Sequence, residues 1–233
     1  MRIGRTGYIV AGVAVIAVAL TVGLVDKSNA DWQQEFAIKS CNLKTTGRST
    51  YFVMEPGFQT VLQDDDTRLQ ITVLQETKIV DGIETRIIEE REWKDGALYE
   101  VSRNYFAMCE ATGDVFYFGE EVDFYKGNRV TGHDGSWLAG VKGARAGLIM
   151  AGTPKVGMKY YQEMAPGVAM DRAEIVETNG VCNTPAGRFE RCLKVKEGSA
   201  LEPWVTEYKY HAPGVGLIRD EDLRLVKVGS AGK

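Results

Sequence analysis

Alternating apolar and polar residues constrain the fold of this chain more than any other feature. Leu69, Ile71 and Val73 alternate with polar neighbours, and the pattern resumes after each of two Asp-Gly pairs, at 81–82 and 95–96. A period of two is typical of half-buried strands, and Asp-Gly pairs favour tight hairpin turns. The sequence therefore predicts a meander of antiparallel hairpins.

The strand signal continues through most of the chain. Residues 115–125, VFYFGEEVDFY, are dense in aromatic and β-branched residues, which favour strands. Residues 86–94, RIIEEREWK, would also suit a helix, but the flanking Asp-Gly pairs favour a strand with its turns. Further strands are predicted at 159–163, 173–177, 189–196, 204–210 and 223–228.

One four-residue motif occurs twice. Ala-Pro-Gly-Val stands at 165–168 and again at 212–215, each time between predicted strands. Proline presets φ for the second position of a type II turn, and glycine accepts the positive φ of the third. Glu-Pro-Gly-Phe at 55–58 is a weaker third instance. Because two copies do not establish a repeat architecture, we interpret the motif as corners of a curved sheet.

The N-terminus predicts export. Arg2 and Arg5 precede an uncharged, mostly apolar run at 9–25, and small residues follow at 28–30. This is the layout of a secretory signal peptide, a signal helix that is removed after Ala30. The alternative is an uncleaved membrane anchor at 9–25, although 17 residues are few for a membrane span. We expect the mature protein in the periplasm or outside the cell.

Charge and composition set the domain plan and exclude some partners. The chain has a formal net charge of −4, and the signal peptide at 1–30 carries +2, so the mature 203 residues carry −6. An acidic chain without a basic stripe does not predict nucleic-acid binding. We predict a polar leading arm at 31–50, a β domain at 51–229 and a tail at 230–233, and no cofactor.

A glycine-rich segment interrupts the β domain. Residues 131–158 contain seven glycines in 28 residues and no clear period. Irregular loops of this length in a compact domain are commonly functional or disordered. The segment is therefore predicted to be a loop that crosses the sheet, and it is the preferred place for a ligand.

The cysteine count permits disulfides in an exported protein, with three possible pairings. If residues 184–187 form a turn, Cys182 faces Phe189, and this register argues against a bridge between the last two cysteines. The pairing is otherwise left open. The candidates are Cys41, Cys109, Cys182 and Cys192.

Few side chains suggest chemistry. His133 and Asp134 could supply a general base or a ligand, but such a pair is common in a glycine-rich loop and no nucleophile can be assigned to it. If the 131–158 loop binds a ligand, the predicted contacts are His133, Trp137 and Arg145. No Cys/His spacing or acidic motif predicts a metal site, and QDDDTR at 63–68 is predicted to be a hairpin tip.

Two further patterns bear on function. Glu120 and Glu121 are adjacent on a predicted strand, so they point to opposite faces and cannot share one acid–base task. The many aromatic residues on the predicted strands suit ordinary sheet packing. Their functional alternative is an aromatic-lined concavity that holds a lipid, pigment or sugar.

Several segments together resemble a known group of proteins. The segments GSWLAG, APGVAMDRAE, TPAGRFERCLK and YHAPGVGL make residues 50–228 similar to an uncharacterised family of exported bacterial β-sheet proteins. PAG-x-F and APGVGL also resemble parts of envelope proteins in which a sheet wraps as an open barrel. The resemblance implies kinship and fold, with no assigned activity or site.

The combined prediction is an all-β domain with a single, mainly antiparallel, strongly curved sheet or open barrel. The preferred function is a non-enzymatic cell-envelope protein that binds a small hydrophobic molecule or a partner protein. One alternative is a hydrolase that uses His133 and Asp134, and another is a structural or adhesive envelope protein. Contact with a membrane is expected only through residues 9–25, if the signal is uncleaved.

Overall fold

The computed structural model describes residues 32–230. The predicted signal helix and the end of the predicted tail lie outside the described residues. Within them the fold is all-β, as predicted, with one three-residue 3-10 helix, η2 (Ile38–Ser40). No helix in this range is long and apolar enough to span a membrane.

Sixteen strands belong to one sheet. In chain order they are β1 (Leu43–Lys44), β2 (Phe58–Gln63), β3 (Thr67–Val80), β4 (Ile83–Lys94), β5 (Ala97–Cys109), β6 (Val115–Lys126), β7 (Arg129–Gly132), β8 (Trp137–Leu138), β9 (Arg145–Met150), β10 (Lys159–Tyr161), β11 (Glu163–Met164), β12 (Asp171–Thr184), β13 (Gly187–Ser199), β14 (Glu207–Ala212), β15 (Gly216–Asp220) and β16 (Leu223–Ser230).

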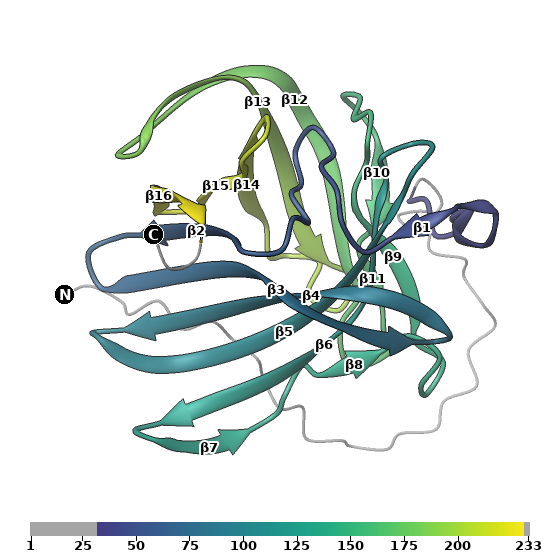
Figure 1. The fold of residues 1–233 in the computed structure, drawn as a ribbon, viewed down its shortest axis with the longest axis horizontal. Coiled ribbons are helices and arrows are strands. Elements are labelled where there is room, and N and C mark those ends of the chain that lie inside the picture. Colours follow the sequence, from purple (N-terminus) through teal and green to yellow (C-terminus); the bar gives the residue numbers. More distant parts are fainter. Residues whose placement is uncertain (1–31, 231–233) are drawn as a thin grey trace. The chain divides into compact units, whose positions relative to one another are not determined.

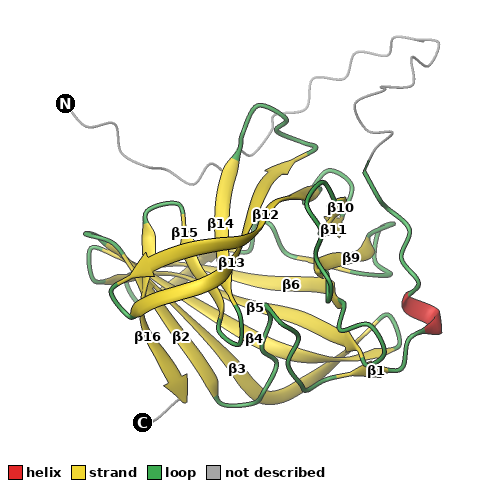
Figure 2. Ribbon diagram, turned by 90° about the horizontal axis from the view of Figure 1, so that it is seen from above, coloured by secondary structure: helices red, strands yellow, loops and turns green. Residues whose placement is uncertain are grey.

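The sheet curves into a nearly closed barrel. Its order is β10-β12-β13-β14-β15-β16-β2-β3-β4-β5-β6-β9-β11, with β1 on β5 and with β7 and β8 on β6. The last strand pairs with β2, so both halves of the meander join in one wall. Figure 1 shows β3 to β6 side by side, with the β12–β13 hairpin arching above them. Figure 2 shows, from above, the neighbouring strands β16, β2, β3, β4, β5 and β6.

One seam of the barrel is not sealed by a continuous ladder. Residues 159–164 span it, because β10 pairs with β12 whereas β11 pairs with β9. The partner changes at Gln162, whose N–H donates to the Asp171 carbonyl at 2.8 Å. The arm covers the free edge of β10, since Gln33 donates to the Lys159 carbonyl and accepts from the Tyr161 N–H. A single segment therefore bridges both ends of the sheet.

The repeated motif forms turns, as its residues predict. Gly167 and Gly214 have φ of +75° and +73°. In each copy the valine N–H donates to the alanine carbonyl, at 2.9 Å and 3.1 Å. The second copy closes the β14–β15 hairpin. The motif is therefore architectural.

The segment at 86–94, which could also have suited a helix, is a strand within β4.

Two boundaries differ from the prediction. The segment 131–158 is not a single irregular loop, because it contains β8 and β9, which pair with β6. Its glycines permit close backbone packing there rather than disorder of the chain. The strand predicted at 204–210 begins only at Glu207, and Trp204 lies in a loop with 77% of its surface exposed.

The disulfide joins Cys41 to Cys109. It fixes the leading arm to the end of β5, where β1 pairs Leu43 with Cys109. Cys182 faces Phe189, as the turn predicted, and Cys182 and Cys192 are free thiols. Burial and the neighbouring Cys182 raise the pKa of Cys192 to about 12, so this thiol stays protonated at neutral pH.

Candidate functional site

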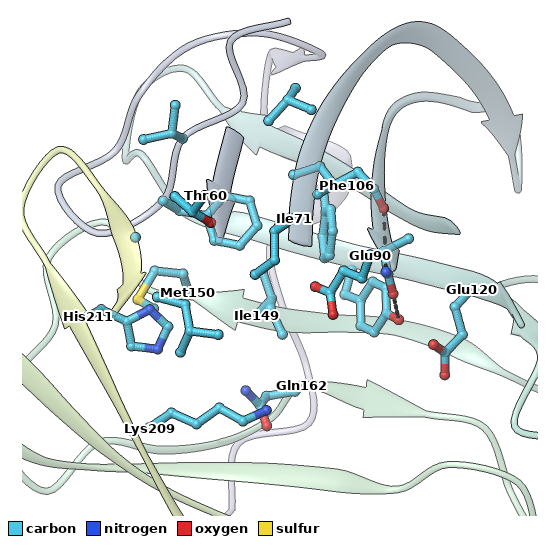
Figure 3. A pocket seen from close by; sticks show the side chains of 18 of the residues that line it. Thr60, Ile71, Glu90, Phe106, Glu120, Ile149, Met150, Gln162, Lys209 and His211 are labelled. Atoms are coloured by element: carbon cyan, nitrogen blue, oxygen red, sulfur yellow. Dashed lines mark hydrogen bonds between the residues drawn. The ribbon is translucent and has the colours of Figure 1, made fainter. Parts of the chain in front are cut away.

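The barrel contains a cavity of about 320 Å³ that is partly open to solvent. One wall is apolar and comes mainly from β2 to β5; it includes Phe58, Ile71, Val73, Ile88 and Phe106. A second part of the lining is polar and lies partly on the same strands, β4 and β5, and partly across the cavity from them. Its side chains are Glu90, Asn104, Tyr117, Glu120, Gln162, Glu163, Asp171, Glu197, Lys209 and His211. Figure 3 shows Ile71 and Phe106 facing this space, with His211 next to Met150 and Lys209 extending towards Gln162.

Strand register explains which side chains face the cavity. On β4, Ile88 and Glu90 share a face, and they lie opposite Asn104 and Ser102 of β5. On β6, a bulge at Gly119, with φ of +135°, inserts an extra residue between Tyr117 and Glu120. The bulge turns both of these side chains to the cavity, whereas strict alternation would separate them.

Part of the polar wall is internally satisfied. Lys209 Nζ lies 3.0 Å from Glu197 Oε2 and 3.8 Å from Asp220 Oδ2, and Gln162 Nε2 donates to Glu197 Oε1 at 2.8 Å. Although burial opposes it, Lys209 and Gln162 hold the pKa of Glu197 below its usual value. The Tyr117 hydroxyl donates to Asn104 Oδ1 at 2.5 Å. These contacts satisfy Lys209, Glu197 and Asn104 within the protein.

Other buried polar atoms have no protein partner within residues 32–230. Glu163 is only 7% exposed; its carboxyl group is within hydrogen-bonding reach of Asp171, but its Oε2 atom has no partner. His211 is 9% exposed, and neither Nδ1 nor Nε2 has a partner. Buried polar groups are normally hydrogen-bonded, because an unsatisfied one costs about 1–3 kcal/mol. Both side chains line the cavity, so a molecule held there could satisfy them.

Four carboxyl groups form what we call the acidic wall: Glu90, Glu120, Glu163 and Asp171. Burial, with smaller effects of neighbouring carboxylates, raises the pKa of Glu90 to about 7 and that of Glu120 to about 8. Burial, together with Asp171 and Glu120, also raises the pKa of Glu163 well above its usual value. Burial lowers the pKa of His211 to about 4, so its imidazole is neutral.

The raised pKa of Glu120 predicts a stability change with pH. Between its ordinary value of 4.5 and about 8, the folded protein holds this proton more tightly than the unfolded chain does. Stability therefore falls as the pH rises through this window. Glu120→Gln should raise the free energy of unfolding by about 2 kcal/mol at about pH 6 and change it little at about pH 4.5. Urea unfolding at both pH values measures this, and equal effects at both would contradict it.

The residues predicted from the sequence do not converge on the cavity. His133 Nδ1 lies 2.9 Å from Asp123 Oδ1, so its carboxylate partner is Asp123 rather than the adjacent Asp134. Arg145 contacts Glu35 at 2.5 Å. Trp137 packs against Tyr117, with ring centroids 5.4 Å apart, one layer behind the cavity wall. Of the 131–158 segment, only Ile149 and Met150 line the cavity.

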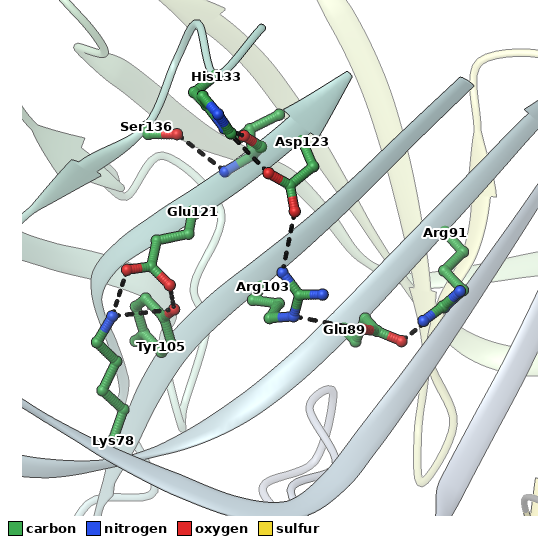
Figure 4. Close-up of polar contacts among 10 residues, drawn as sticks. Lys78, Glu89, Arg91, Arg103, Tyr105, Glu121, Asp123, His133 and Ser136 are labelled. Atoms are coloured by element: carbon green, nitrogen blue, oxygen red, sulfur yellow. Dashed lines mark hydrogen bonds and ion pairs between the residues drawn. The ribbon is translucent and has the colours of Figure 1, made fainter. Parts of the chain in front are cut away.

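His133 instead ends a chain of charges that runs outside the barrel. Glu89 lies 2.7 Å from Arg91 and 3.5 Å from Arg103, and Arg103 lies 3.2 Å from Asp123 (Figure 4). The chain crosses β4, β5 and β6. Glu121, which is exposed, binds Lys78 and Tyr105 on a neighbouring part of this surface. Glu120 and Glu121 therefore face opposite sides, as predicted.

The chemistry of the cavity suits binding. Within the described chain no group of three or more His, Cys, Asp or Glu side chains could hold a metal ion. Sequence reasoning missed Glu90, Glu163, Lys209 and His211. The one available signal was the glutamates at 90 and 92, which continue the parity of Ile88 along β4. Acidic residues in register with an inward apolar residue indicate a polar interior.

Comparisons with known proteins add little. No protein family and no curated protein sequence matches the chain. One solved structure is similar, that of "a putative lipoprotein from Parabacteroides distasonis ATCC 8503", with a TM-score of 0.40 and 13% identity over 79% of this chain and 100% of that chain. A likeness this distant carries no argument about function. The resemblance to exported bacterial β-sheet proteins stays a prediction.

Proposed function

We propose that the mature protein is an exported, non-enzymatic binding protein that holds one small amphiphilic molecule inside its barrel. The observation that carries the proposal is the cavity itself, where an apolar wall faces buried polar atoms without partners. The cavity has a volume of about 320 Å³. Pockets for small ligands begin near this size and combine apolar walls with a few polar groups.

Three observations support export. The first 30 residues have the layout of a signal peptide. The Cys41–Cys109 disulfide suits an oxidising compartment outside the cytoplasm. The sequence motifs also resemble those of exported bacterial proteins. We therefore place the ligand in the periplasm or the medium, where a carrier or a sensor of small molecules would meet it.

The position of His133 favours binding over hydrolysis. Its Nδ1 also lies 3.0 Å from the Val122 carbonyl, and 69% of the side-chain surface is exposed. The residue lies outside the cavity lining, so a substrate held in the barrel would not reach it. His133→Ala should therefore leave binding in the cavity unchanged.

Filling the cavity tests the proposal. Ile71 lines the cavity, whereas Ile79 on the same strand is 73% exposed. Ile71→Trp should remove the space for a ligand, and Ile79→Trp is the matched control. We expect native mass spectrometry of the wild type, purified gently from its own host, to show a mass excess that is lost on denaturation. Ile79→Trp should retain this excess and Ile71→Trp should lack it.

A second readout covers loss of the ligand during purification. The neutral fluorophore phenylnaphthylamine should bind the wild type and Ile79→Trp, and bind Ile71→Trp at least about tenfold more weakly. A bare wild-type mass together with no fluorophore binding would refute the carrier proposal and favour a structural or adhesive role. Equal binding by both tryptophan variants would place the ligand elsewhere on the protein.

A further inference from the structure

We infer that the ligand is an organic cation: the acidic wall receives an ammonium or amidinium group, and the apolar wall receives the rest of the molecule. This inference rests on the proposed function and names the chemical class of its ligand. It follows from the charges that face the cavity, from the unpartnered atoms there, and from the spacing of the carboxyl groups.

The charges facing the cavity are unbalanced. Lys209 is the one lysine or arginine among the lining residues of the described chain, and Glu197 and Asp220 already neutralise it. Within residues 32–230, no member of the acidic wall forms an ion pair with a basic side chain. An isolated carboxylate inside a protein is costly, so it either takes up a proton or acquires a cationic partner. A cationic ligand would supply that partner.

Unpartnered atoms give independent support. His211 lines the cavity on the opposite side from Glu120 (Figure 3), and both of its ring nitrogens are buried without a hydrogen-bond partner. A neutral imidazole offers one donor and one acceptor. The Glu163 Oε2 atom offers an acceptor. A ligand with an ammonium group and a second polar group, such as a hydroxyl, would satisfy these atoms together.

The spacing of the carboxyl groups favours an organic cation over a metal ion. They come from β4, β6, β11 and the start of β12, and Figure 3 shows Glu90 and Glu120 at separate places along the wall. A metal ion needs several oxygen or nitrogen ligands converging at about 2.0–2.6 Å. The described residues contain no such group. Glu163 and Asp171 form one hydrogen-bonded pair, and Glu90 and Glu120 lie apart from each other, which suits an extended amine with a hydrocarbon portion.

Binding of a cation should depend on pH. The titratable side chains that face the cavity are Glu90, Glu120, Glu163, Asp171, Glu197, Lys209, His211 and Tyr117. In the empty protein the glutamates of the acidic wall hold protons near neutral pH. An ammonium group remains charged up to about pH 10, as lysine does. The cation should therefore displace protons, and its affinity should rise between about pH 5.5 and 8.5.

Three probes share a similar hydrocarbon chain and differ in the charge of the head group: octylammonium, octanol and octanoate. They separate the contribution of charge to binding from that of apolar contact. Titration calorimetry at about pH 8 should give octylammonium an affinity at least about tenfold higher than that of octanol, with octanoate weakest. Repeating the octylammonium titration in buffers of different ionisation enthalpy should show proton release. Displacement of phenylnaphthylamine by each probe confirms that the same cavity is occupied.

Two isosteric variants and one control identify the wall. The double variant with Glu120→Gln and Glu163→Gln should bind octylammonium at least about tenfold more weakly than the wild type does. Its affinity for octanol should stay within about twofold of the wild-type value. Glu121→Gln removes the same charge from the next residue, which lies on the outer face. It should leave the affinities for octylammonium and octanol unchanged. Unchanged octanol binding shows that the double variant is folded.

The outcomes separate this inference from the function on which it rests. If octanol and octylammonium bind equally, and the double variant changes neither, the cavity binds apolar molecules and the inference of a cation is wrong. If octanoate binds most tightly, the inference is likewise wrong. If phenylnaphthylamine binds but none of the three probes binds or displaces it, the inference of a cation is wrong and the proposed function stands. If phenylnaphthylamine does not bind either and the native mass is bare, the proposed function itself fails.

Discussion

Replacing Cys41 and Cys109 by alanine is expected to lower the free energy of unfolding by about 4 kcal/mol. The bond joins residues separated by 68 positions, and closing so long a loop removes much conformational entropy from the unfolded chain. It also holds the leading arm against β5, beside the two residue pairs of β1. For a domain of this size we expect the melting temperature to fall by about 10 °C.

Denaturant unfolding of the double variant, compared with Cys182→Ala, measures this effect. Cys182 is a free thiol, so its removal should change stability by less than about 1 kcal/mol. Reduction of the denatured wild type should add the mass of two hydrogen atoms. Before reduction, an alkylating reagent should label two thiols in the denatured wild type. Labelling of all four thiols, or a bridge between Cys182 and Cys192, would contradict the assignment.

Much of the fold was predictable because its signals are local. Period-two alternation and Asp-Gly turns identify β3, β4 and β5, and the two glycines of the repeated motif adopt the predicted positive φ. The pairing of Cys182 with Phe189 across the β12–β13 hairpin follows from the position of the turn at 184–187. Closure into a barrel depends instead on pairing β16 with β2, more than 150 residues apart. Such pairing leaves no local trace in the sequence.

The site was harder to predict because its side chains depend on a bulge and on the choice of face. The alternation at Ile83, Thr85 and Ile87 correctly indicates a strand, but the cavity is lined by the opposite parity, with Ile88 and Glu90. On β6 the bulge at Gly119 brings Glu120 to the side of Tyr117, where uninterrupted alternation would bring Glu121. A one-residue shift reverses which carboxylate is buried.

The seam gives the second large expected effect: Gly147→Ala should destabilise the protein by about 3 kcal/mol. Gly147 lies on β9 where the bridging segment 159–164 crosses it. An added Cβ would collide with the carbonyl group of Gln162 and lie 2.7 Å from the Tyr161 oxygen. These neighbours are backbone atoms, so relief requires the bridging segment to move away from β9.

Gly229→Ala is the matched control. Gly229 lies on β16 without a positive φ, and an added Cβ there would meet nothing within 4 Å, so we expect a change below about 0.5 kcal/mol. In Gly147→Ala, hydrogen exchange at the Gln162 amide, which donates to Asp171 across the seam, should accelerate more than exchange in β3 or β4. Because Gln162 and Glu163 line the cavity, the variant should also bind phenylnaphthylamine more weakly. Wild-type stability in Gly147→Ala would show that the segment can shift at no cost. The seam would then be a flexible edge of the barrel, and the acidic wall would be held by β4, β6 and β12 alone.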